Sequence, residues 1–307
     1  MSVEVAGPLT HRCVGCGTSC HGVQVRVLED ERESLSARAE QLGVDAPFDG
    51  DHLRLGDRGA CVFLDANQRC RLHAEFGAEA KPWLCRQYPL VAVEIEGEVV
   101  RAGVDPGCAH AWQSWPEGPE VPDEEVYLSS STLGTYDGTV ELAMIGLCDP
   151  AQRSLGDVLG ALRGLNKVEG LPIGIASRLA RRALDSRIAE RLVHPDTAAP
   201  IRAHLEPVAA LLDTLDPDRL PVWRLGEREE RWAIEATRRF LFLRLNAGAP
   251  VMARTLGMLT GAVLVGWASP EPDRFGPALA CWSRVMRTDA LTALFGTDEH
   301  IQALVRR

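Results

Sequence analysis

The chain has 307 residues, enough for two domains of ordinary size or one large one, and its 46% apolar content can form a substantial core. Its net charge of −10 comes from acidic residues scattered along the chain. Because no basic stripe is present that could neutralise phosphates, we expect no nucleic-acid partner.

The opening residues, MSVEVAGPLTHR, lack the basic and apolar regions of a secretory signal, so we expect a cytoplasmic protein. The most apolar later segment, Val251 to Ala268, carries Arg254 and falls short of roughly 20 apolar residues. This segment is predicted to be a buried helix, and we expect no membrane partner.

The first region, residues 1–115, is predicted to be a small cysteine-rich α+β domain. Helical patterns cover Glu31 to Leu42 and, more briefly, His73 to Ala80 before a proline. Leu90 to Glu96 alternates apolar with polar residues, and after a glycine Glu98 to Val104 is β-branched again. These two segments are predicted to form a β-hairpin.

A change of composition marks the end of this region. Residues 113–125 contain three prolines and five acidic residues, which is typical of an exposed linker. We predict that residues 116–150 form a linker with irregular or β structure. Residues 151–307 are predicted to be an all-α domain, because apolar residues recur near the helical period. The expected helices are Leu155 to Leu165, Ile175 to Val193, Ala198 to Leu215, Glu227 to Leu245, Val251 to Trp267, Pro277 to Arg287 and Asp289 to Arg306.

Cysteines are concentrated in the first region. Of nine in the chain, seven lie in this region, and they are Cys13, Cys16, Cys20, Cys61, Cys70, Cys85 and Cys108. In a reducing compartment this concentration favours metal ligation over disulfides, and the odd count also disfavours a closed disulfide framework. Cys148 and Cys281 each stand alone in an apolar setting, so we interpret them as buried free thiols.

The number of cysteines exceeds the need of one metal centre. A tetrahedral zinc ion takes four ligands, and a [4Fe–4S] cluster takes four thiolates. Either one centre uses four cysteines, or two centres share the seven with help from His21, His73 or His110. Among these histidines, His21 is the strongest candidate because it directly follows Cys20.

The segment Gly59 to Leu90 resembles the CxxCxxCC group, the YkgJ-like cysteine-cluster proteins, which are described as zinc- or iron-chelating domains. The residues that carry the resemblance are Cys61, Phe63, Leu64, Asp65, Cys70, Leu72, His73, Pro82, Cys85, Arg86, Tyr88 and Pro89. The upstream cysteines occupy the place of the family's N-terminal cluster, and Cys108 looks like a further cysteine of longer members. Where relatives carry two adjacent cysteines, this chain has Cys20 followed by His21.

The resemblance implies a metal cofactor, with a [4Fe–4S] cluster as the first expectation and zinc as the alternative. Arg86 and Tyr88 are then expected beside the cofactor, with Arg86 donating hydrogen bonds toward sulfur or a carboxylate and Tyr88 covering the site. One branch, flagellin lysine-N-methylase, couples such a domain to a helical part and transfers methyl groups from S-adenosylmethionine to a protein substrate. The alternative is a non-catalytic, metal-stabilised module that binds a protein partner. No G-x-G-x-x-G loop is present, so a Rossmann-type cofactor site is not expected.

Overall fold

The computed structural model describes residues 2–7, 9–11, 16–21, 23–56, 59–95, 99–115, 138–162, 225–268 and 271–287, with a few separate positions between 206 and 213 and between 292 and 295. The protein is of the α+β class, as predicted. Small sheets lie in the N-terminal region, and the C-terminal region is mostly helical.

The cysteine-rich lobe is built from short elements. In chain order these are the 3-10 turns η1 (Thr18–Cys20) and η2 (Glu29–Glu31), helix α1 (Arg32–Gln41), strands β2 (Phe48–Asp49) and β3 (His52–Leu53), helix α2 (Arg71–Phe76), turn η4 (Ala78–Ala80) and helix α3 (Trp83–Gln87). A small core of buried side chains holds them together, including Val27, Leu35, Phe63 and Leu72. The lobe therefore has little apolar packing of its own.

The helix expected at residues 31–42 is confirmed as α1. The helix expected at residues 73–80 is divided into α2 and η4, because Gly77 between them has a φ of +88°, outside the helical region.

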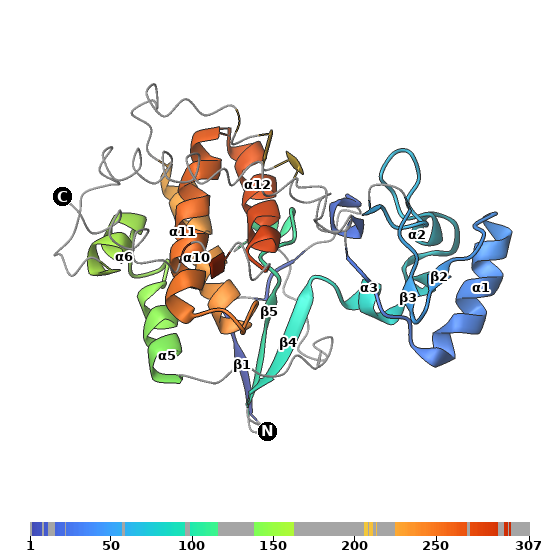
Figure 1. Ribbon diagram of the computed structural model, residues 1–307, viewed down its shortest axis with the longest axis horizontal. Coiled ribbons are helices and arrows are strands. Elements are labelled where there is room, and N and C mark those ends of the chain that lie inside the picture. Colours follow the sequence, from blue (N-terminus) through green and yellow to red (C-terminus); the bar gives the residue numbers. More distant parts are fainter. Residues whose placement is uncertain are drawn as a thin grey trace.

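A sheet follows, in the order β1 (Ser2–Val5), β5 (Val99–Val104), β4 (Leu90–Ile95). Strands β4 and β5 pair antiparallel, with Leu90 opposite Val104, so the predicted hairpin is confirmed. Strand β1 pairs parallel to β5, which brings the start of the chain against its hundredth residue. Figure 1 shows this sheet between the cysteine-rich lobe and helices α10–α12.

The helices beyond the sheet match several of the expected segments. They are α4 (Ala111–Ser114), α5 (Gly138–Leu147), α6 (Leu155–Leu162), α10 (Glu227–Phe242), α11 (Val251–Ala268) and α12 (Pro272–Val285). Helix α12 begins five residues earlier than predicted, since Pro272 is tolerated in the first turn of a helix. The helix expected at residues 175–193 lies outside the described residues, as does nearly all of those expected at 198–215 and 289–306.

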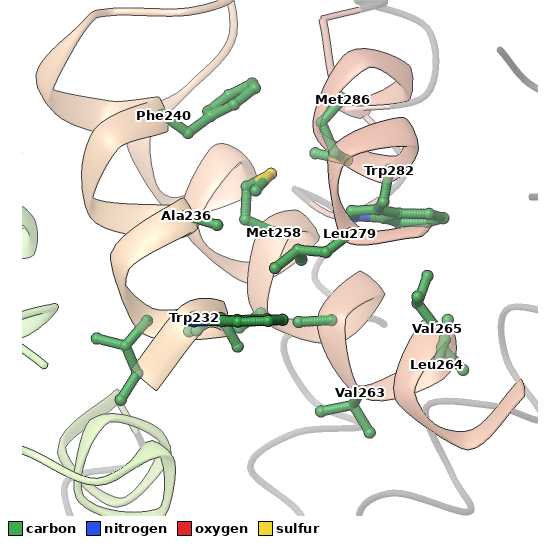
Figure 2. Packing of buried hydrophobic residues seen from close by; sticks show 14 of the residues in the cluster. Trp232, Ala236, Phe240, Met258, Val263, Leu264, Val265, Leu279, Trp282 and Met286 are labelled. Carbon is green, nitrogen blue, oxygen red and sulfur yellow. The ribbon is translucent and has the colours of Figure 1, made fainter. Parts of the chain in front are cut away.

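Helices α10, α11 and α12 pack around a large apolar core (Figure 2), to which Trp232, Met258 and Trp282 each contribute. The indole nitrogen of Trp282 donates a hydrogen bond to the carbonyl oxygen of Gly257, 3.0 Å away. Trp112 of α4 is buried in the same core, with its ring centroid 6.4 Å from that of Trp232. Ala109, Trp112 and Trp115, which follow Cys108, therefore pack with the helices.

Part of the expected linker is helical. Residues 116–137 lie outside the described residues, but 138–147 form α5 and not the irregular or β structure that we predicted. Two contacts account for the helix. Ile145 packs against Ala6 and Leu241. Glu141 is buried against three arginines, Arg101, Arg244 and Arg254.

None of the described helices is long and apolar enough to cross a membrane. Helix α11 is buried over most of its length, as predicted, and its Arg254 is only 2% exposed. The Arg254 guanidinium donates to Glu141 Oε2 at 3.1 Å, while Arg101 of β5 donates to Glu141 Oε1 at 2.9 Å. One carboxylate thus joins the sheet to two helices.

We predict that Glu141→Ala lowers the free energy of unfolding by about 3–5 kcal/mol, because buried Arg254, Arg101 and Arg244 each lose an ion pair with this carboxylate. Chemical denaturation of the full chain measures this change. Glu94→Ala, which removes an exposed carboxylate from β4, is the matched control and should change stability little. An equal, small effect of both substitutions would contradict the role assigned to Glu141.

Candidate metal centre

A cavity of about 300 Å³ lies at the junction of the cysteine-rich lobe and the sheet. Its walls are mostly apolar, and among the described residues six cysteines line it: Cys16, Cys20, Cys61, Cys70, Cys85 and Cys108. The cavity therefore brings together all of the predicted cysteine ligands except Cys13, which lies outside the described residues.

Backbone hydrogen bonds fix the segments that carry these thiols. The amide of Cys20 donates to the carbonyl of Gly17 at 2.8 Å, and the amide of Cys61 donates to the carbonyl of Cys20 at 2.9 Å. Gly17 has a φ of +68°, and a Cβ atom there would lie 2.1 Å from the carbonyl oxygen of Gln68. This position therefore requires glycine.

The segment between Cys61 and Cys70 closes through a side-chain turn. The Asp65 carboxylate accepts hydrogen bonds from the backbone amides of Asn67 and Arg69, each at 2.8 Å. An aspartate that bonds the backbone two residues ahead is a standard turn former. The acidic residue of the family pattern thus has a local role, which is to bring the two cysteines back toward each other.

Helix α3 carries Cys85 and begins directly after Pro82. The backbone amide of Trp83 donates to Glu31 Oε1 at 2.6 Å, which anchors this helix to the turn before α1. Arg86 forms a 2.6 Å ion pair with Glu79 and lies 3.9 Å from Glu31. Its side chain is not among those lining the cavity. Of the two partners expected for Arg86, sulfur or a carboxylate, the structure shows the carboxylate.

Tyr88 does line the cavity, as expected of a residue that covers the site. Its hydroxyl oxygen accepts a hydrogen bond from Arg284 Nη2 at 3.2 Å.

The histidines are arranged differently from the prediction. His21 Nε2 is hydrogen-bonded to the side-chain oxygen of Gln68, and His21 is not among the cavity-lining residues. By contrast, the cavity is lined by His11, His73 and His110. Both ring nitrogens of His11 are buried, and neither has a hydrogen-bond partner among the described residues. Burial, with smaller effects from His110 and the Arg239 charge, lowers the pKa of His11 to about 4.

The thiols influence one another electrostatically. Burial raises the pKa of Cys20 to about 12, and Cys61 and Cys70 add to the shift. Burial raises the pKa of Cys61 to about 11, with a contribution from Cys70. Burial also raises the pKa of Cys85, and Cys61 and Cys20 add to this increase. For both Cys20 and Cys85, Lys81 is the group that opposes the increase. These four thiols all line the same cavity.

Cys108 lines the same cavity. Burial raises its pKa to about 12, against hydrogen bonds from the backbone amides of His110 and Ala111. Asp105 and Cys16 add smaller increases. Cys16 contributes to the raised pKa of Cys20 as well as to that of Cys108. Cys108 already has two backbone donors that would stabilise a thiolate.

The cavity supplies the donors that soft metals require. Thiolates suit zinc and iron–sulfur clusters, and the raised pKa values mean that at neutral pH a cation would have to displace the thiol protons. Among the described residues, no three Cys, His, Asp or Glu side chains converge closely enough to hold an ion as they stand. Coordination would therefore require these side chains to move inward on the metal.

The other two cysteines have different surroundings. Cys148 is fully buried in the helical core, and Cys281 packs against that core. Neither is among the residues that line the cavity. Their interpretation as apolar, unligated thiols agrees with these positions.

Arg284 is a site residue that the sequence did not indicate. It lies at the end of α12, is 9% exposed, and reaches the segments that carry the cysteines. Its Nε atom donates to the carbonyl oxygen of Gly107 at 2.8 Å, and its Nη2 atom to Ser19 Oγ at 2.7 Å. No spacing rule connects an arginine near residue 280 with cysteines near residues 20 and 108.

Comparison with known families agrees with this site. A family model named CxxCxxCC, described as a "putative zinc- or iron-chelating domain", matches residues 12–108. The match confirms the resemblance noted in the sequence, and the matched segment contains all seven clustered cysteines. Comparison with curated proteins and with solved structures found no match to the chain.

Proposed function

We propose, from the match of residues 12–108 to a zinc- or iron-chelating family, that the cavity holds an iron–sulfur cluster ligated by Cys20, Cys61, Cys70 and Cys85. The observation that carries the proposal is that these four thiols line one cavity. In addition, Cys70 contributes to the raised pKa of Cys20, Cys61 and Cys85. A [4Fe–4S] cluster requires four thiolates, and this group supplies that number.

The size of the cavity favours a cluster over a single ion. A tetrahedral zinc ion with four thiolates leaves little space between its ligands, with Zn–S distances of about 2.3 Å. The cavity measures about 300 Å³, which is near the lower end of small-molecule sites, at roughly 300–1,000 Å³. Zinc in the same four-thiol group is the alternative. A reducing compartment such as the cytoplasm would keep the thiols available for either metal.

We expect protein purified without oxygen to contain about four irons and four sulfides per chain and to show a broad visible absorption band. Cys85→Ala should lose most of this iron. Cys148→Ala, which removes a buried thiol from the helical core and not from the cavity, should keep it. Iron and sulfide analysis of the three proteins measures this difference. Colourless wild-type protein that contains only zinc would contradict the cluster.

A more specific proposal is methyl transfer from S-adenosylmethionine to a lysine of a protein substrate. It rests on the resemblance to flagellin lysine-N-methylase, whose cysteine-cluster domain is also coupled to a helical part. Such a transfer needs an unprotonated lysine amine held in line with the methyl group, in a site that excludes water. The apolar walls of the cavity are compatible with this requirement.

For methyl transfer, we expect the cluster-containing protein to label lysines of candidate proteins when it is given S-adenosylmethionine with a labelled methyl group. Cys85→Ala should lose the labelling together with the iron. Full cluster loading without transfer to any lysine would contradict the methylase and leave the metal site intact.

A non-catalytic, metal-stabilised module that binds a protein partner is the second candidate, and the small core of the cysteine-rich lobe favours it. A lobe with so few buried side chains would gain much of its stability from the metal, so that chelation would unfold it. The labelling experiment separates the two candidates, because a module of this kind transfers no methyl group.

A further inference from the structure

Arg284 connects the helical core to three segments that carry cavity thiols. Its guanidinium donates to the carbonyl oxygen of Gly107, to Thr18 and Ser19 in η1, and to the Tyr88 hydroxyl. Gly107 directly precedes Cys108, η1 ends at Cys20, and Tyr88 follows Cys85 by three residues. One side chain thus contacts all three segments, although the partners lie 177 to 266 residues away in sequence.

The base of this side chain is fixed by the helical core. Trp282 and Met286, two residues to either side of Arg284, are fully buried. One turn away, Arg287 forms an ion pair with Asp105 Oδ1, and the same oxygen accepts a hydrogen bond from the amide of Gly107 at 2.7 Å. The end of α12 therefore holds the loop before Cys108 at two points.

Arg284 is also a buried positive charge beside the thiol cavity. Burial opposes the charge, but Tyr88 and Asp105 outweigh this effect and raise the pKa of Arg284. A metal centre with four thiolates carries net negative charge, so a fixed guanidinium nearby would stabilise it. Arg284 can thus act on the bound centre both through the positions of the loops and through its charge.

We propose that Arg284 is a positioning residue for the metal centre, and that through it metal binding in the cysteine-rich lobe is coupled to the stability of the helical core. The proposal rests on the proposed metal-binding function. If Arg284 favours the metal-bound arrangement of the three segments, then the metal must in turn favour the packing of α12 that presents Arg284. The helical part would then respond to whether the site is loaded.

The test uses the reduced full-length protein without oxygen, with Zn²⁺ as the probe ion in competition with a coloured chelator. Arg284→Gln should weaken zinc binding about 10- to 100-fold, the usual effect of removing a partner that orients metal ligands. Arg284→Lys keeps the charge but not the set of hydrogen bonds, so it should lie between Arg284→Gln and the wild type. Arg274→Gln, on the same helix with a side chain 75% exposed, is the matched control and should bind as the wild type does.

Two further readouts separate positioning from a general loss of stability. With Co²⁺ as the probe, Arg284→Gln should show weaker thiolate-to-metal charge-transfer absorption per bound ion, because fewer thiols reach the metal. Ser19→Ala removes one acceptor and should weaken zinc binding modestly in the wild type. It should have no further effect in the Arg284→Gln protein, because these two residues act through the same contact.

The coupling itself is measured by heating the protein and following tryptophan fluorescence of the helical core. Zinc should raise the unfolding temperature of the wild type and of Arg274→Gln by similar amounts, and that of Arg284→Gln by less. Wild-type zinc affinity, an unchanged cobalt spectrum and a full temperature shift in Arg284→Gln would overturn the positioning role while leaving metal binding in place. A wild-type protein that binds neither ion and contains no iron–sulfur cluster when purified without oxygen would overturn the proposed function, and this inference with it.

Discussion

Thiols that share one cavity repel one another as soon as they lose their protons, and the N-terminal part of this protein is arranged around that constraint. Cys20, Cys61 and Cys85 each have a pKa raised by burial and by neighbouring thiols. Lys81 partly compensates this increase for Cys20 and Cys85, and a backbone hydrogen bond at Phe63 does so for Cys61. Without a cation the group is stable only in its protonated form at neutral pH. A divalent metal or a cluster replaces the protons with positive charge. The thiolates that would otherwise repel one another then serve as its ligands.

This constraint also explains why the cysteine-rich lobe depends on the rest of the chain. Its own core is small, and the cavity that it forms is completed by the sheet and by the loop before α4. Trp112 anchors that loop in the helical core, and Arg284 reaches back from α12 to the cysteine-bearing segments. The family match ends at Cys108, but the residues that support the site continue into the helical part of the chain. The helical part therefore supports a site whose own residues lie almost entirely in the N-terminal part.

Local patterns in the sequence predicted the elements that depend on local interactions. The hairpin of β4 and β5, helices α1, α10 and α11, and the buried nature of α11 follow from periodicity. The clustered cysteines were identified by their spacing and by resemblance. The contribution of β1 to the sheet was missed, because four residues of alternating pattern are too short to indicate a partner a hundred residues away.

The site shows the same limit. His21 was the preferred histidine because it adjoins Cys20, yet its ring is turned toward Gln68, while His11 lines the cavity from a position outside the family match. Arg86 carries the family pattern but pairs with Glu79. Neighbours in sequence can point in different directions where the backbone turns, and only the folded chain decides which side chains face the cavity. Arg284 had no sequence signal at all, since its role depends on contacts across the whole chain.

The central claim, that these thiols exchange their protons for a metal, is tested most directly by counting protons. Zinc binding to the reduced, metal-free protein at pH 7 can be followed by calorimetry in buffers of different ionisation enthalpy. If four protonated thiols of the cavity become ligands, about four protons should be released for each zinc bound, since thiols bind metals as thiolates. Zinc binding that releases no protons would contradict the account, because the metal would then be held by other groups.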